Sequence, residues 1–135
     1  TIKTKNMKAV ELLEAYPKAA NVIGEFYHGK MVSSLENDGD IIPEDFKEMI
    51  KSQEFDNEYL AKFIDSNPRF LFDVFDANDI FIQTPLHWKG EDATFGYTIE
   101  STGTDTMGSS DTYPYRDIAE KFAVEKATEY LNDKL

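Results

Sequence analysis

The chain has 135 residues, a formal net charge of −12 and no cysteine. This length suits one domain, and the apolar and charged fractions are those of a folded globular protein. Disulfides, thiolate zinc sites and cysteine nucleophiles are excluded, and the negative charge argues against direct binding to nucleic acid or to anionic lipid.

No run of residues approaches the ~18 apolar positions that a membrane span requires. Near the N-terminus, Glu11 and Glu14 interrupt the apolar stretch that a signal peptide would need. We therefore expect a soluble protein without membrane contact. We expect it in the cytoplasm, and the lack of cysteine is compatible with that location.

The first 76 residues predict about five short helices. Asn6 and Asp56 are candidate N-caps, and Pro17 and Pro43 suit first helical turns. His28 lies away from the apolar stripe of its helix, so we expect it to face solvent. The helices are expected at residues 6–15 and 17–35, from Pro43, from Asp56 and over residues 69–75. The last of these is apolar on nearly all sides, so we expect it to be the central buried helix.

Strict alternation is clearest in residues 94–100, where Phe95, Tyr97 and Ile99 share one side of a strand. Ile80 and Ile82 share a side in the segment before it, and residues 89–92 supply a turn. The pattern predicts an antiparallel hairpin of residues 80–88 and 94–100. Helices must cover its apolar face, because a lone hairpin is not stable in water.

Residues 101–113 are rich in Ser, Thr, Gly and Asp and predict a loop or a ragged third strand. A closing helix is expected from Pro114 to Leu131, packed across the strands. The predicted class is therefore α+β. A helical region, 1–76, is followed by a ββ(β)α region, 77–135, and we expect the two to share one core.

No motif identifies a catalytic residue, a cofactor or a metal site. His87 with Glu91 and Asp92 is the best metal candidate, but ligands so close together on one turn rarely converge on one ion. A calcium loop beginning at Asp76 lacks the required glycine, and the glycines at 103 and 108 lack the lysine of a phosphate-binding loop. We predict no cofactor and no metal.

The last sixty or so residues resemble a double-stranded-RNA-binding domain in outline, with alanines spaced along the final helix from Arg116 onward. That family grips phosphates with a lysine cluster at the start of this helix. Here the cluster is replaced by Tyr115, Arg116, Asp117 and Glu120, which argues against RNA binding. The chain as a whole also resembles small open reading frames of phages and mobile elements, a resemblance that no single motif carries.

The remaining candidates are aromatic. Trp88, His87, Tyr113 and Tyr115 lie in or beside the hairpin and its following loop. Trp88 either caps the edge of the core, which the sequence favours, or is an exposed anchor for a partner.

The sequence does not identify a function, and three hypotheses stay open. The first is a non-catalytic interaction module that presents the hairpin end around Trp88 and the loop 101–113 to a protein partner, whose own charge could be basic. The second is an acidic mimic of nucleic acid that occupies a basic DNA- or RNA-binding protein. The third is a small enzyme that uses carboxylates and His87. The oligomeric state is open.

Overall fold

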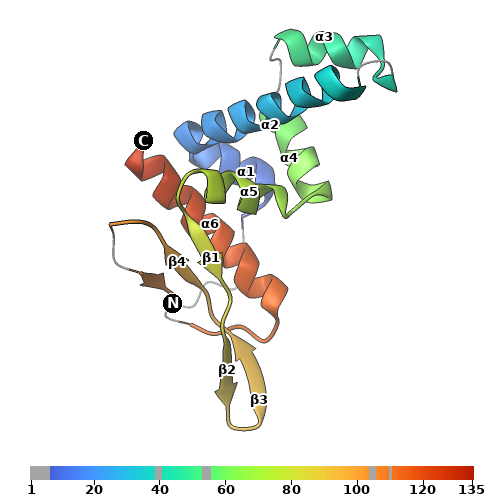
Figure 1. Ribbon diagram of the computed structural model, residues 1–135. Coiled ribbons are helices and arrows are strands. Elements are labelled where there is room, and N and C mark those ends of the chain that lie inside the picture. The colour runs from blue at the N-terminus through green and yellow to red at the C-terminus, as the bar shows by residue number, and fades with distance from the viewer. Residues whose placement is uncertain (1–6, 39–40, 53–55, 104–105, 110) are drawn as a thin grey trace.

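The computed structural model describes residues 7–38, 41–52, 56–103, 106–109 and 111–135 (Figure 1). Within these residues, helices dominate the first half, short antiparallel strands follow, and a long helix closes the chain, so the predicted α+β class is confirmed. The elements are α1 (Ala9–Ala15), α2 (Pro17–Asp38), α3 (Glu44–Ser52), α4 (Asn57–Ser66), α5 (Phe70–Ala77), β1 (Phe81–Gln83), β2 (Leu86–Lys89), β3 (Asp92–Phe95), β4 (Thr98–Glu100), β5 (Met107–Gly108) and α6 (Arg116–Lys134).

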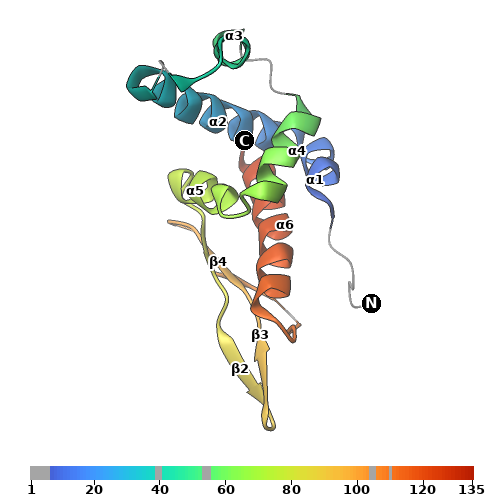
Figure 2. The same ribbon diagram turned by 90° about the vertical axis from the view of Figure 1, so that its right-hand side faces the viewer.

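One cluster of buried side chains runs through the helices and the sheet. Helix α6 packs on α2 and α5 and also on β3 and β4, so it joins the helical half of the chain to the strands (Figure 2). The predicted central helix α5 buries one side and leaves Asp73 and Asp76 exposed on the other. The largest fully buried members of the cluster come from almost every layer: Leu13, Ile23, Leu60, Val74, Phe75, Ile80, Ile99 and Leu131.

Aromatic rings fill the space between α2, α4 and α5. The Phe70 ring centroid lies 5.0 Å from that of Phe63 and 5.7 Å from that of Phe26, and Tyr27 lies 4.7 Å from Phe63 in an edge-on arrangement. Such pairs add about 0.5–1.5 kcal/mol beyond the burial of their area. The Tyr27 hydroxyl lies 2.8 Å from that of Tyr59, and burial raises the pKa of Tyr27. This cluster fixes how the three helices pack.

Local capping sets the helix ends. Asp56 caps α4 as predicted, because its side chain accepts a hydrogen bond from the Tyr59 N–H at 2.8 Å. Helix α1 begins at Ala9, later than predicted, with Lys8 in extended backbone before it. The candidate cap Asn6 lies outside the described residues.

His28 is half-buried, so the expectation that it faces solvent is wrong. Its Nε2 atom lies 2.8 Å from the carbonyl oxygen of Ile50, which is fully buried in α3. Helix α3 folds back on α2 and covers a second side of that helix. The apolar stripe of α2 indicated only the side of the helix that faces the main core. It could not indicate the burial of His28, because a polar side chain outside the stripe can be buried when it forms a hydrogen bond.

Helix α2 is capped from a distance. The Asn132 side-chain oxygen, near the end of α6, accepts hydrogen bonds from the backbone N–H groups of Lys18 and Ala19, at 2.9 and 3.2 Å. These N–H groups lie in the first turn of α2 and have no partner within that helix. The contact therefore ties the last helix of the chain to the start of the second.

Asn132→Ala should lower the free energy of unfolding by about 1 kcal/mol, the usual effect of losing a helix cap. Asn132→Asp keeps the accepting oxygen and should retain most of the stability. Urea unfolding followed by circular dichroism measures both variants. An equal loss from Asn132→Asp would mean that the side-chain oxygen is not what stabilises the helix end.

The strands form one long hairpin in a single register. Strand β1 pairs with β4 at the base of the hairpin, and β2 pairs with β3 at its outer end. Ile82 lies opposite Ile99, and four residues further along both segments Leu86 lies opposite Phe95, so no extra residue is inserted between the two pairs of strands. The turn is Gly90–Glu91, and Gly90 has a φ of 65°, the glycine position of a type II′ hairpin turn. The predicted hairpin and turn are confirmed.

The ladder is broken at Thr84 and Pro85, inside the segment predicted as one strand. Pro85 has no N–H group to donate, although its carbonyl oxygen accepts a hydrogen bond from the Gly96 N–H at 3.1 Å. Strand β5 adds to β4 on the other side, with Ile99 opposite Met107. The described part of the segment 101–113 thus includes a short third strand.

A carboxylate holds the α5–β1 turn to the β4–β5 turn. Asp79 has a left-handed φ of 62°, and its side chain accepts hydrogen bonds from the Thr102 N–H and hydroxyl, both at 2.9 Å, and from the Ser101 hydroxyl at 3.3 Å. The hydrogen bonds from Thr102 are the main reason that the pKa of Asp79 is lowered.

Because the pKa of Asp79 is lower in the folded state, its contribution to stability should be complete above the ordinary aspartate value of about 3.9. That contribution should disappear as the pH falls through the lowered pKa. The free energy of unfolding of the protein and of Asp79→Asn, measured from neutral to acid pH, should therefore differ at neutral pH and converge in acid. Asparagine tolerates the left-handed backbone, so a pH-independent difference would contradict this account.

Candidate functional site

The apolar face of the hairpin continues into its outer end, residues 86–95, which we call the arm. Alternate residues of a strand share a face, and paired residues of an antiparallel ladder lie on the same side. Figure 2 shows β2 and β3 extending beyond the helices. One face of the hairpin therefore carries, from base to tip, Ile82 and Ile99, then Tyr97, then Leu86 and Phe95, and finally Trp88 and Ala93.

Burial falls along this face. Ile99 is fully buried, Tyr97 and Phe95 are half-buried, Leu86 is 47% exposed and Trp88 is 68% exposed. The side chains on this face are apolar from base to tip, but the rest of the protein covers them only near the base. The arm therefore exposes large hydrophobic groups that belong to the same face as the core of the sheet.

The start of α6 decides where the cover ends. This helix begins at Arg116, two residues later than the predicted start, because Tyr115 has extended backbone. The guanidinium of Arg116 lies 4.9 Å from the centre of the Phe95 ring, so the first helical residue covers the arm only at its base.

Tyr113 closes the base of the arm from the other side. Its backbone exchanges two hydrogen bonds with Phe95, at 2.7 and 2.8 Å, and its ring stacks on Phe122 of α6 at 4.7 Å and 14°. Burial is the main reason that the pKa of Tyr113 is raised. The ring is thus part of the packing between the strands and α6.

The predicted site residues separate into three environments. Trp88 is exposed on the arm, so the interpretation as a cap over the core edge is wrong: the arm carries this residue past the start of α6. Tyr115 is 65% exposed just before that helix. His87 is exposed but lies on the opposite face of the arm, and Tyr113 is half-buried at the base.

The opposite face is polar and tightly packed at its base. The Thr94 hydroxyl donates to the carbonyl oxygen of His87 at 3.1 Å. Gly96 is buried, and a Cβ atom there would lie 3.0 Å from Ser109 Oγ and 3.3 Å from His87 Nε2, so a larger residue does not fit without movement. The Tyr97 N–H donates to Ser109 Oγ at 3.0 Å, which anchors the base of the arm to the segment after β5.

Sequence reasoning missed Leu86. It lies two residues before Trp88 and therefore on the same face of the strand, a signal that the alternation rule contains. Phe81, 45% exposed, was also missed, and it lies on the opposite face, since its neighbour Ile82 faces the core. Phe81 is a natural control for any test of the arm.

His87 is the histidine of the metal-site and enzyme hypotheses. Within the described residues, no three His, Asp or Glu side chains are grouped so that they could hold a metal ion. A groove on the helical side of the molecule is lined by other residues and does not include His87.

No protein-family model matches the chain, and neither a curated protein nor a solved structure shows significant similarity to it. In the part of the chain that the structure describes, no helix combines the length and the apolar character needed to cross a membrane.

Proposed function

We propose that the chain is a non-catalytic protein-interaction module that binds a protein partner through the apolar face of its arm. The observation that carries the proposal is the exposure of Leu86 and Trp88 side by side on one strand face. Tryptophan is enriched among the residues that dominate binding energy at interfaces, particularly where neighbouring groups exclude water from it. Tyr115, next to the base of the arm, supplies a second exposed aromatic ring.

The apolar face of the arm is suited to contact with a partner, because the body of the protein does not cover it. A two-stranded hairpin is marginally stable in water when nothing covers its apolar face. An apolar pocket on a partner would cover Leu86 and Trp88, as α6 covers Ile99. The described part of the segment 101–113 packs on β4 and α6, so the proposal rests on the arm and Tyr115 rather than on that segment.

Binding to the arm can be tested after a partner is captured with the unmodified protein and purified. Trp88→Ala should weaken its affinity about 30-fold, the effect of losing about 2 kcal/mol at an interface centre. Phe81→Ala is the matched control, since it removes an exposed aromatic ring from the opposite face. Unchanged affinity for Trp88→Ala, or an equal loss for Phe81→Ala, would remove the arm from the interface.

Salt dependence distinguishes this proposal from the acidic-mimic alternative. An apolar interface centred on Trp88 should change little in affinity between low and moderate salt. A nucleic-acid mimic should lose affinity steeply as salt rises, by the same counterion effects that govern protein–DNA contacts.

A cytoplasmic location, which the cysteine-free composition permits, is part of the proposal.

A further inference from the structure

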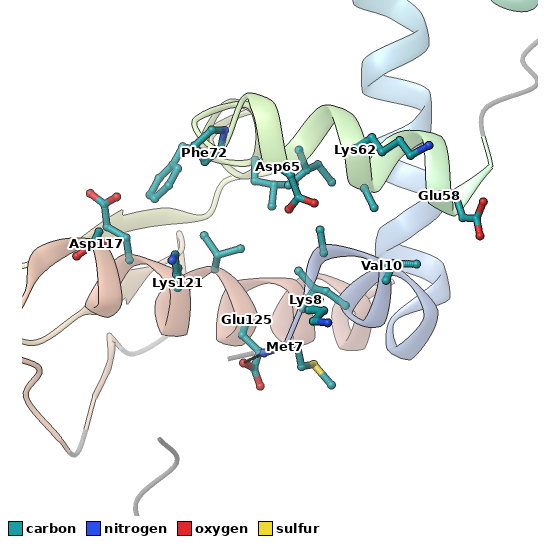
Figure 3. Close-up of a pocket in the computed structure, with 18 residues that line it drawn as sticks. Met7, Lys8, Val10, Glu58, Lys62, Asp65, Phe72, Asp117, Lys121 and Glu125 are labelled. Atoms are coloured by element: carbon teal, nitrogen blue, oxygen red, sulfur yellow. Dashed lines mark hydrogen bonds between the residues drawn. The ribbon is translucent and has the colours of Figure 1, made fainter. Parts of the chain in front are cut away.

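A groove of about 1130 Å³ lies on the helical side of the molecule, away from the arm (Figure 3). Helices α4 and α5 form one lip, and α6 with the start of α1 forms the other. This volume exceeds the range of about 300–1,000 Å³ that is usual for small-molecule pockets. Its apolar lining, which we call the floor, includes Val10, Ala61, Ile64, Leu71 and Val124.

Charged side chains line both lips. On α4 they are Glu58, Lys62 and Asp65, which lie along one side of the helix at spacings of four and three residues. On α6 a row of Asp117, Lys121 and Glu125 has spacings of four residues, Glu120 lies beside it, and Lys8 lines the groove just before α1. Each row is acidic at its two ends and basic in the middle.

Most of these charges are free to bind a partner. In the described part of the chain, no hydrogen bond or ion pair involves the side chains of Glu58, Lys62, Asp65, Asp117 or Lys121. Two carboxylates of the groove are engaged: Glu120 is paired with Arg69 at 3.3 Å, and Glu125 accepts a hydrogen bond from the Met7 N–H at 3.4 Å. Five carboxylates and three lysines, Lys8 among them, line the groove, so its net negative charge is complementary to a basic ligand.

The walls determine the backbone form of the ligand. All four helices that border the groove satisfy their interior N–H and C=O groups internally, so they offer an extended peptide no strand edge to pair with. A helix satisfies its own backbone and presents apolar side chains at intervals of three and four residues. It is therefore the backbone form that walls built from helices favour.

We propose that this groove binds an amphipathic helix of a protein partner, with its apolar stripe on the floor and Lys or Arg beside the stripe, facing the carboxylates of both lips. In the part of the chain whose burial the structure describes, no α-helix exposes the large apolar side chains of such a stripe, so a helix of a second copy does not meet this description. Among the described residues, the exposed large hydrophobic side chains are Ile41, Phe81, Leu86, Trp88, Tyr115 and Leu135, and none lies within an α-helix.

Two synthetic helical peptides test the proposal. They share one leucine stripe, and the positions beside it are Lys in one peptide and Glu in the other. We expect the Lys peptide to bind at least about tenfold more tightly in calorimetric titration at low salt, because like charges across an interface oppose binding. Amide shifts in NMR should change at Ala61, Ile64 and Val124. Absence of binding by the Lys peptide, or equal binding of both, would overturn the proposal.

A charge-matched pair of variants gives the control. The double variant Asp65→Lys with Asp117→Lys should weaken binding of the Lys peptide about tenfold or more. Asp76→Lys with Glu100→Lys makes the same change in net charge at exposed positions outside the groove. At an ionic strength of about 0.15 M, where distant charges are screened, this pair should leave the affinity within about twofold. Equal effects of the two pairs would mean that only the overall charge attracts the peptide.

Binding of the Lys peptide in the groove can be distinguished from binding of a partner by the arm. Trp88→Ala should bind the Lys peptide as the unmodified protein does, and the shift changes should spare Leu86 and Trp88. Peptide-induced shifts confined to the arm would overturn the groove proposal while leaving the arm proposal in place. Self-association of the protein that the Lys peptide reverses would show that a second copy is the occupant, which also contradicts the proposal.

Discussion

Ile99→Ala is expected to lower the free energy of unfolding by about 2–5 kcal/mol, the range for truncating a large aliphatic side chain in a core. Ile99 is fully buried in β4, and it faces the same core cluster as Phe75 and Leu131. Removing its outer carbons leaves a cavity where the sheet meets the helices. Urea unfolding at neutral pH measures the loss.

Trp88→Ala is the control on the same face of the same hairpin. Because Trp88 is 68% exposed, its truncation should change the free energy of unfolding by no more than about 0.5 kcal/mol. The contrast tests whether the apolar face really loses its cover between Ile99 and Trp88. A loss of several kcal/mol from Trp88→Ala would mean that the indole packs against the body of the protein.

Phe70→Ala should be at least as destabilising, by about 3–5 kcal/mol. The ring is buried between α2, α4 and α5, and its neighbours Phe26, Tyr27 and Phe63 all lie within 6.1 Å between ring centres. Its removal takes away both the buried area and the edge-on contacts with Tyr27 and Phe63. Calorimetric unfolding is a suitable measurement, since the loss should appear as a lower midpoint temperature.

Phe72→Ala, two residues along α5, separates this core effect from a general effect on the helix. The Phe72 ring is half-buried and lies under the Arg69 guanidinium at 4.3 Å, so its loss should cost about 1 kcal/mol, the centre of the range for single substitutions. Equal losses from the two variants would show that the aromatic cluster around Phe70 is not a main source of stability.

The hairpin could be predicted because its signals are local. Alternation from Phe95 to Ile99 and the glycine in the turn depend only on neighbours along the chain, and both indicate the pairing that the structure has. The cap at Asp56 is local in the same way. Each of these features is decided within a few residues.

The exposure of Trp88 could not be predicted in this way. It depends on where α6 begins relative to the strands, and Pro114 suggested a start that would have covered more of the arm. Instead, Tyr115 is extended and the helix starts at Arg116. The environment of His28 depends in the same manner on α3, which returns to cover a side of α2 that its own pattern leaves polar.

The groove could not be predicted from sequence patterns either. Its two charged rows lie on α4 and α6, about fifty residues apart in sequence, and each row alone looks like the solvated side of an ordinary helix. Only the packing of α5 and α1 around them turns these rows into the lips of one groove. Surfaces built from several helices therefore appear only when tertiary structure is known.

The fluorescence of the protein's only tryptophan tests the central claim most directly, because that claim places Trp88 beyond the cover of α6. In the folded protein, at a concentration low enough to prevent association, the emission maximum should lie close to that of the unfolded chain. Acrylamide should quench it almost as efficiently as it quenches the unfolded chain. A blue-shifted emission that is protected from acrylamide in the folded monomer would contradict the account.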